Sequence, residues 1–202
     1  MSLRTALKAL FFVGALVCVL PLIVLTWFEK KCSRSELVFT FCAQLLAVAP
    51  GWPGARLRGA YYFGTLDDCS WETHVGFGSI FTHRGASLAP RASLGAYCVV
   101  GHARLGSGVM VGSRVSIPSG KRQHLDEGGN LASGHNRFDT VTVGEGTWIG
   151  EGAILMADVG SQCIVSAGAV VGKAMPDATL IGGNPARVLR ELEGRAGAVS
   201  EA

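Results

Sequence analysis

The sequence is poor in charge. Asp, Glu, Lys and Arg make up 16% of its 202 residues, whereas a typical soluble domain has about 25%. The 18 basic and 15 acidic residues leave a formal net charge of +3. That excess is too small for a surface that tracks nucleic-acid phosphates, so we expect no nucleic-acid partner. Apolar side chains reach 49%, which excludes an intrinsically disordered chain.

Paired cysteines are also lacking. The six cysteines stand alone, and no C-x-x-C pair indicates a zinc ribbon, a haem site or a redox centre. We therefore expect reduced thiols.

A long apolar run stands near the amino terminus. From Leu10 to Phe28 the chain carries no charge, and about 19 residues at about 1.5 Å each give roughly 28 Å, enough to cross the hydrocarbon core. No A-x-A-like cleavage site precedes the charged residues 29–31, so we predict a retained transmembrane anchor over residues 1–31 rather than a signal peptide. Basic residues flank the run almost equally, and the positive-inside rule therefore selects no orientation.

A second apolar run is too short to cross a bilayer. Ser33 and Glu36 have the spacing of a capping box, and Pro50 ends the run that they precede. We predict a short membrane-associated helix over residues 33–50, with a core helix of the soluble domain as the alternative. Residues 51–74, which open on a Gly/Pro-rich break, are expected to be a linker and an N-terminal cap.

The body of the chain is a repeat of about six residues. Neither the 3.6-residue period of a helix nor the two-residue period of an ordinary strand explains it, whereas a solenoid of short strands does. Small residues beside each aliphatic one allow tight corners. The aliphatic positions are Val75, Phe81, Leu88, Leu94, Val100, Leu105, Val111, Ile117, Val143, Ile149, Leu155, Val159, Val165 and Val171.

The repeat resembles the hexapeptide-repeat acyltransferases over roughly residues 75–192. The likeness is most specific at residues 147–150 (TWIG) and 183–186 (GNPA). It implies a mainly β protein, a left-handed parallel β-helix over residues 75–183, and a homotrimer. The strings at residues 119–124 and 156–160 look most like those of envelope-polysaccharide O-acetyltransferases.

The end of the repeat predicts a helix. Asn184 suits an N-cap and Pro185 the first helical position, so we expect a C-terminal capping helix and tail over residues 184–202, with the helix reaching about Arg195. Such a helix would cover the open end of the solenoid.

An excursion at residues 118–140 interrupts the repeat, and long interruptions of this kind are usually functional. It carries His124 and His135. The resemblance implies that His124 is the catalytic residue, a general base that takes the proton of a hydroxyl as its oxygen attacks the thioester of acetyl-CoA. Arg122 is a candidate for binding an acidic acceptor.

Counting hexads predicts that His83, His102 and Ser119 stack at one corner of successive coils, where the excursion leaves. We expect these residues to bind the substrate. Several histidines in one region also raise the possibility of zinc. Their spacing does not match the carbonic anhydrases of this fold, so no metal is expected.

The resemblance places coenzyme A in a groove between neighbouring subunits, along the C-terminal coils. Trp148, Gly150, Ala167 and Gly168 occupy the matching stretch, and Trp148 could instead pack at the subunit interface. Lys173 and Arg187 at the end of those coils are candidates for binding the phosphates of coenzyme A.

These patterns predict an acetyl-CoA-dependent O-acetyltransferase of bacterial envelope glycan synthesis, acting on a sugar or glycolipid at the inner membrane with its catalytic domain facing the cytoplasm. With one spanning helix the amino terminus would lie outside, whereas a re-entrant hairpin would keep both ends inside. The alternatives are an inactive β-helix that scaffolds a membrane glycan-assembly complex and an N-acetyltransferase that acts on an amino sugar.

Overall fold

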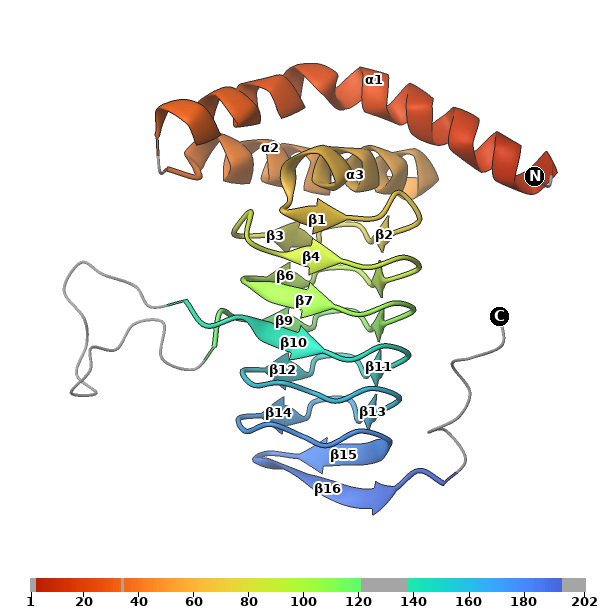
Figure 1. The fold of residues 1–202 in the computed structure, drawn as a ribbon, viewed down its shortest axis with the longest axis vertical. Helices are drawn as coiled ribbons and strands as arrows, with labels where there is room; N and C mark the ends of the chain where they lie inside the picture. The colour runs from red at the N-terminus through yellow and green to blue at the C-terminus, as the bar shows by residue number, and fades with distance from the viewer. Residues whose placement is uncertain (1–2, 34, 121–137, 194–202) are drawn as a thin grey trace.

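Three helices lie across one end of a parallel β-solenoid (Figure 1). The computed structural model describes residues 3–33, 35–120 and 138–193. The helices are α1 (Leu3–Cys32), α2 (Leu37–Ala47) and α3 (Gly51–Thr65), and together we call them the helical layer.

The solenoid has three faces, each a sheet of stacked short strands. Face 1 contains β1 (Asp68–Cys69), β4 (Ser87–Leu88), β7 (Ala103–Leu105) and β10 (Val141–Val143). Face 2 contains β2 (His74–Val75), β5 (Ser93–Leu94), β8 (Met110–Val111), β11 (Trp148–Ile149), β13 (Ile164–Val165), β15 (Thr179–Gly183) and β16 (Ala186–Glu191). Face 3 contains β3 (Ile80–Phe81), β6 (Val99–Val100), β9 (Ser116–Ile117), β12 (Ile154–Leu155) and β14 (Val170–Val171).

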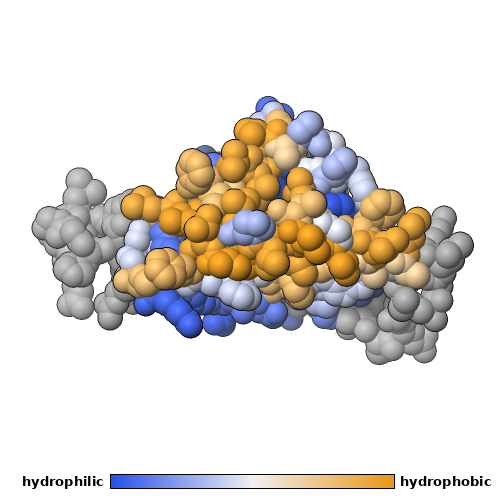
Figure 2. All heavy atoms as spheres, turned by 90° about the horizontal axis from the view of Figure 1, so that it is seen from above, coloured by the Kyte–Doolittle hydropathy of each residue, from blue (hydrophilic) through white to orange (hydrophobic). Residues whose placement is uncertain are grey.

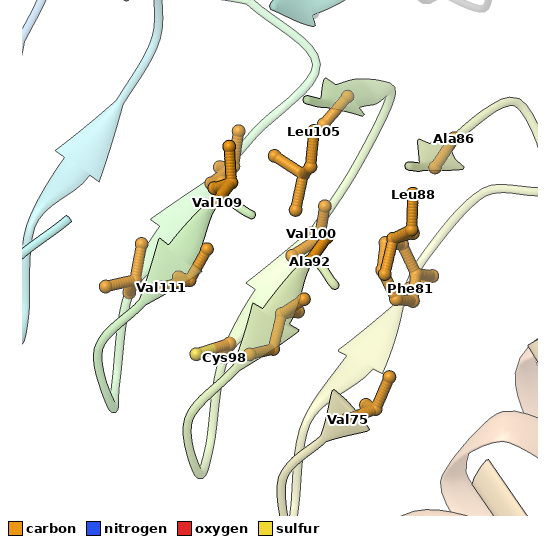
Figure 3. Packing of buried hydrophobic residues seen from close by; sticks show 14 of the residues in the cluster. Val75, Phe81, Ala86, Leu88, Ala92, Cys98, Val100, Leu105, Val109 and Val111 are labelled. Atoms are coloured by element: carbon orange, nitrogen blue, oxygen red, sulfur yellow. The ribbon is translucent and has the colours of Figure 1, made fainter. Parts of the chain in front are cut away.

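The predicted repeat positions form the core of the solenoid. All fourteen aliphatic and aromatic positions named above point inward, and none is more than 5% exposed. Figure 3 shows Val75, Phe81, Leu88, Val100 and Val111 in the interior, contributed by three successive coils. The one-per-hexad description missed a second inward position in each hexad. Residues such as Cys98, Val109, Val115 and Cys163 fill it.

The predicted C-terminal helix is wrong. Asn184 and Pro185 lie in the turn of a hairpin, and the residues after them form β16, antiparallel to β15. Through this pairing Ala186–Glu191 satisfies the backbone groups at the free edge of face 2, which a helix would have left open. A strand therefore caps this end of the solenoid.

Two expectations for the N-terminal region are also corrected. Residues 51–74, expected to be a linker and an N-terminal cap, contain helix α3 over the first coils, and Arg58, Tyr61 and Tyr62 of this helix are buried, so only the linker is wrong. Pro53 is tolerated there because first-turn amides have no partner within the helix. Ser33 does not cap α2, because no side chain bonds the amides of that helix from its N-cap position.

The helical layer buries one side and exposes the other. Phe12, Val19 and Ile23 of α1 are buried, and a Cβ on Gly64 of α3 would lie 2.6 Å from Ile23, so the two helices approach closely. The outward side chains include Leu10, Phe11, Val17, Leu20, Val24 and Phe28 of α1 with Leu37, Phe41 and Leu45 of α2. These helices form a largely apolar surface at this end of the molecule (Figure 2).

By length and composition Ala6–Cys32 can cross a membrane. In the structure, however, α1 lies along the other two helices (Figure 1). The indole of Trp27 donates a hydrogen bond to the Gly64 carbonyl at 2.7 Å, and Phe12 meets Phe63 edge-on at 5.2 Å between ring centroids.

Candidate functional site

Two histidines and a serine stack at one corner of the solenoid, as the hexad count predicts. The register pairs Phe81 with Val100 and Val100 with Ile117, and His83, His102 and Ser119 stand two residues beyond these positions. The imidazole centroids of His83 and His102 are 4.8 Å apart, and Ser119 Oγ accepts a hydrogen bond from the His102 amide at 2.9 Å. We call this group the histidine corner.

The excursion leaves and returns at the histidine corner. Phe138 lies against both imidazoles, with centroid distances of 4.4 Å to His83 and 5.2 Å to His102. The Asp139 amide donates to the Ser119 carbonyl at 3.0 Å, which fixes the returning chain beside the departing one. Phe138 carries no repeat signal and was not predicted. The predicted base His124, the predicted acceptor-binding residue Arg122, and His135 lie outside the described residues.

Glu36 binds His83 directly, a contact that sequence reasoning missed. Its Oε2 lies 2.6 Å from His83 Nδ1, although the two residues are 47 positions apart. Its Oε1 accepts a hydrogen bond from the Arg84 amide at 2.9 Å. Glu36, which the sequence analysis assigned to a capping box, therefore connects the start of α2 to the histidine corner.

This contact fixes which nitrogen of His83 carries a proton. Burial raises the pKa of the Glu36 carboxyl, but the hydrogen bonds from His83 and the Arg84 amide, together with the charges of His83 and Arg84, leave that pKa below its ordinary value. An ionised carboxylate can only accept, so His83 Nδ1 donates. In the neutral imidazole Nε2 then keeps its lone pair and can accept a proton from a substrate.

A buried ion pair supports Glu36. The Arg84 guanidinium lies 3.3 Å from the Glu29 carboxylate of α1, and its Nη2 donates to the Ser35 carbonyl at 2.7 Å. Glu29 also accepts from the Val38 and Phe39 amides and so caps α2 in place of Ser33. The end of α1, the start of α2 and the turn after β3 are thus joined behind His83.

The pKa of His102 lies below its ordinary value. Burial lowers its pKa, and the neighbouring His83 lowers it further. Gly85 makes room for this ring, because a Cβ there would lie 2.5 Å from His102 Cε1. The corner thus presents two half-buried imidazoles tilted by 38° to each other, and the ring of Phe138 stacks on that of His102.

Lys173 lies at the foot of the same corner. Lys173 follows Val171 by two residues, and His83 follows Phe81 by the same number. Because Phe81 in β3 and Val171 in β14 lie at opposite ends of face 3, His83 and Lys173 occupy equivalent turns at the two ends of the solenoid. Three coil steps of about 4.8 Å separate the His102 and Lys173 coils by roughly 14 Å. With Arg187, Lys173 lines a pocket of about 330 Å³, completed by Gly172, Pro185 and Ala186. The two predicted phosphate-binding cations therefore share one pocket.

The other predicted coenzyme A residues lie elsewhere on the solenoid. Trp148 begins β11 and is 48% exposed, and Gly150 follows that strand. A Cβ on Gly150 would lie 2.5 Å from the Ala167 nitrogen, so this glycine is required for the coils to stack. Gly168 has a φ of +68° and an open surface above it. These four residues lie on face 2 and the turn that follows it, away from the turns of the histidine corner.

Within the part of the chain that the structure describes, no group of three or more His, Cys, Asp and Glu side chains could hold a metal ion.

Comparison with known proteins shows acetyltransferases on this fold. No protein-family model matches the chain. A Saccharomyces cerevisiae protein named provisionally as an acetyltransferase is 33% identical over 54 residues, which are 26% of this chain and 28% of that protein. Maltose O-acetyltransferase from Clostridium difficile 630 is 21% identical with a TM-score of 0.56, and the match covers 78% of this chain and 87% of that one. Galactoside acetyltransferase in complex with coenzyme A is 15% identical with a TM-score of 0.60, covering 83% and 86%. These likenesses confirm the predicted solenoid fold.

Proposed function

We propose that the protein is an acetyl-CoA-dependent O-acetyltransferase that modifies a sugar hydroxyl in the synthesis of a membrane-associated glycan. One observation carries the proposal: the histidine corner lies directly beneath the helical layer, and a cationic pocket lies at the foot of the same column of turns. The acetyltransferases that share the fold support the reaction class.

The chain's own residues suit proton transfer from a hydroxyl. His124, which follows Gly120 by four residues in the sequence, is proposed as the general base. An imidazole with an ordinary pKa of about 6.5 is largely neutral at pH 7 and can take the hydroxyl proton as the oxygen attacks the acetyl carbon. His83 Nε2, oriented by Glu36, binds the acceptor hydroxyl and is a second candidate for the base. His102, Ser119 and Arg122 are proposed to contact the acceptor.

Acetyl-CoA fits the cationic pocket through its phosphates. Lys173 and Arg187 offer an ammonium and a guanidinium at the pocket rim, which are the side chains that bind phosphate best. The substrate supplies an activated acetyl group. We propose a homotrimer in which Trp148, Gly150, Ala167 and Gly168 of one subunit complete the groove along a neighbour's histidine corner.

The helical layer supports a membrane location. An exposed apolar surface of three packed helices is stable only against a lipid or protein partner. Because α1 lies along α2 and α3, we propose that the layer is embedded in one leaflet with both chain ends on the cytoplasmic side, where acetyl-CoA is found. This arrangement keeps the contacts that α1 makes with α3, whereas a single upright span would break them.

The test is thiol release from acetyl-CoA by detergent-purified full-length protein with envelope glycolipids or free sugars as acceptors. Release that depends on a hydroxyl acceptor and falls at least about 100-fold in His124→Ala supports the transferase and its base. Release only with amino sugars would show N-acetylation instead. Acetyl-CoA binding without release from any acceptor, unchanged in His124→Ala, would favour the inactive scaffold.

A further inference from the structure

We propose that a second site, separate from the histidine corner, binds a phosphate group carried by a membrane lipid. The site is a pocket of about 300 Å³ between the helical layer and the first coils. Its lining includes Lys8, Arg56, Trp71, Glu72, His74 and Arg91. Neither the repeat nor the proposed acetyl transfer accounts for it.

The pocket holds more basic than acidic side chains: three cations and His74 line it with one carboxylate, Glu72, and no salt bridge joins Glu72 to any of the cations among the described residues. Lys8, Arg56 and Arg91 come from three separate segments, and among the described residues none of them forms a salt bridge. The Arg56 Nε is buried and has no hydrogen-bond partner there. A buried guanidinium nitrogen without a partner costs free energy, so a bound anion would satisfy a group that the protein alone leaves unpaired.

His74, another lining residue, also lies near positive charge. Its pKa is lowered by burial first and then by the charges of Arg56 and Arg58. A neutral His74 can hydrogen-bond through its ring nitrogens and adds no positive charge beside Arg56 and Arg58. Lysine offers a point charge and arginine a planar fork of donors, the combination that suits phosphate oxygens.

The position of the pocket selects a lipid as the carrier. Lys8 lies on α1 and Arg56 on α3, and both helices turn apolar side chains outward. At this edge of the layer Phe11 meets Trp52 at 5.0 Å, and the Arg56 guanidinium lies 5.2 Å from the Trp52 ring centroid. Cations and tryptophans just below an apolar surface match the depth of lipid headgroups.

The pocket and the histidine corner lie at different corners of the solenoid. Trp71 and Arg91 belong to turns between face 1 and face 2, whereas the histidine corner lies between face 3 and face 1. The lipid site can therefore fail without affecting the proposed acetyl transfer, and the converse also holds.

The experiment measures binding to detergent-purified full-length protein by calorimetry. The probes are short-chain phosphatidic acid, farnesyl diphosphate, the matching phosphatidylcholine and inorganic phosphate. We expect both phosphate-terminated lipids to bind at least about tenfold more tightly than phosphatidylcholine and inorganic phosphate. Preference for phosphatidic acid would identify a headgroup site, and preference for farnesyl diphosphate would identify a site for a lipid carrier.

Matched variants test the assignment. Arg56→Gln and Arg91→Gln should each weaken lipid binding about tenfold, while Arg91→Lys and the exposed solenoid control Arg104→Gln should not. Acetyl transfer to a soluble acceptor should be unchanged in Arg91→Gln, which also reports that the variant is folded. Equal lipid binding by wild type and both Gln variants would overturn the proposal, as would inorganic phosphate binding as tightly as the lipids.

Discussion

The helical layer and the solenoid are both rich in apolar residues but use them in opposite ways. In the solenoid the aliphatic side chains point inward, and Leu88, Val100 and Ile149 are fully buried. In the helical layer Leu10 is 68% exposed and Phe41 is 65% exposed. Apolar side chains therefore build a protein core in one region and remain exposed on the surface in the other, which is the basis of the proposed membrane location.

Buried polar groups hold the two regions together. Arg58 of α3 is 1% exposed and donates to the carbonyls of Leu46, Ala47 and Ala49 near the end of α2 and of Val75 in the solenoid. On the other side Glu36 and Arg84 connect the start of α2 to the turn after β3. The candidate site is built on this second connection, so its geometry depends on both regions.

Arg58→Gln should have the largest effect. It leaves several buried carbonyls without a donor, and we expect a loss of about 4 kcal/mol in the free energy of unfolding, or failure to fold. Thermal unfolding in detergent measures it. Arg104→Gln on the exposed side of β7 is the control and should change stability by less than about 0.5 kcal/mol. A small loss in Arg58→Gln would mean that the two regions are joined mainly by apolar packing.

His83→Gln should lower kcat/KM for the acceptor about 100-fold, because the bound hydroxyl loses its oriented partner. Glu36→Gln should lower kcat/KM about tenfold or more, because His83 then loses the carboxylate that fixes its tautomer and orientation. Steady-state kinetics with varied acceptor measure both. Glu36→Asp should restore part of the lost kcat/KM. The control Glu151→Gln, on the exposed surface of the solenoid, should leave kcat/KM unchanged. Wild-type kinetics in Glu36→Gln would remove the carboxylate from the mechanism.

One matched pair of substitutions compares the exposed apolar residues of the helical layer with those of the solenoid. Phe41→Asp on α2 should weaken partition into lipid vesicles by about 2 kcal/mol, whereas Val99→Asp on β6, 44% exposed on the solenoid, should leave it unchanged. Vesicle flotation measures the partition. If the two substitutions had equal effects, the helical layer would not be the membrane-facing region.

Lys173→Ala and Arg187→Ala should each raise the KM for acetyl-CoA about tenfold and leave kcat nearly unchanged, because each removes one charge-assisted contact far from the acetyl group. Initial rates at varied acetyl-CoA measure this effect, with Arg104→Ala as the control. A fall in kcat without a change in KM would contradict a role in binding the phosphates.

The smallest effect concerns pH. Because the folded-state pKa of His102 is lowered, the unfolded chain binds the proton more readily, and stability falls as the pH drops below the unfolded value of about 6.5. Melting temperatures between pH 7.5 and pH 5.5 should therefore fall less steeply in His102→Gln than in wild type. An equal slope would mean that His102 titrates normally in the folded protein.

Sequence reasoning succeeded where structure is local and repetitive. The hexad period fixes which residues point inward, and it placed His83, His102 and Ser119 at one corner although the repeat shortens to five residues before Leu105. Each of these positions is set by its own coil and the next, so the pattern contains the information.

Sequence reasoning failed where contacts with residues far away in the chain determine the local structure. Asn184-Pro185 is compatible with a helix start and with a hairpin turn, and the unpaired edge of β15 selects the hairpin. Glu36 has the spacing of a capping residue, but Arg84 and His83, far away in the chain, bind its carboxylate instead. The Gly/Pro-rich start of α3 resembles a linker until Tyr61 and Tyr62 are buried against the helices and the first coils.

The most direct test of the account is a crystal structure of the full-length protein with coenzyme A and a sugar acceptor bound. The account predicts the phosphates of coenzyme A at Lys173 and Arg187, the thiol directed up the same column of turns, and the acceptor hydroxyl within hydrogen-bonding distance of an imidazole at the histidine corner. Coenzyme A bound away from these two cations, with the acceptor remote from His83, would contradict it.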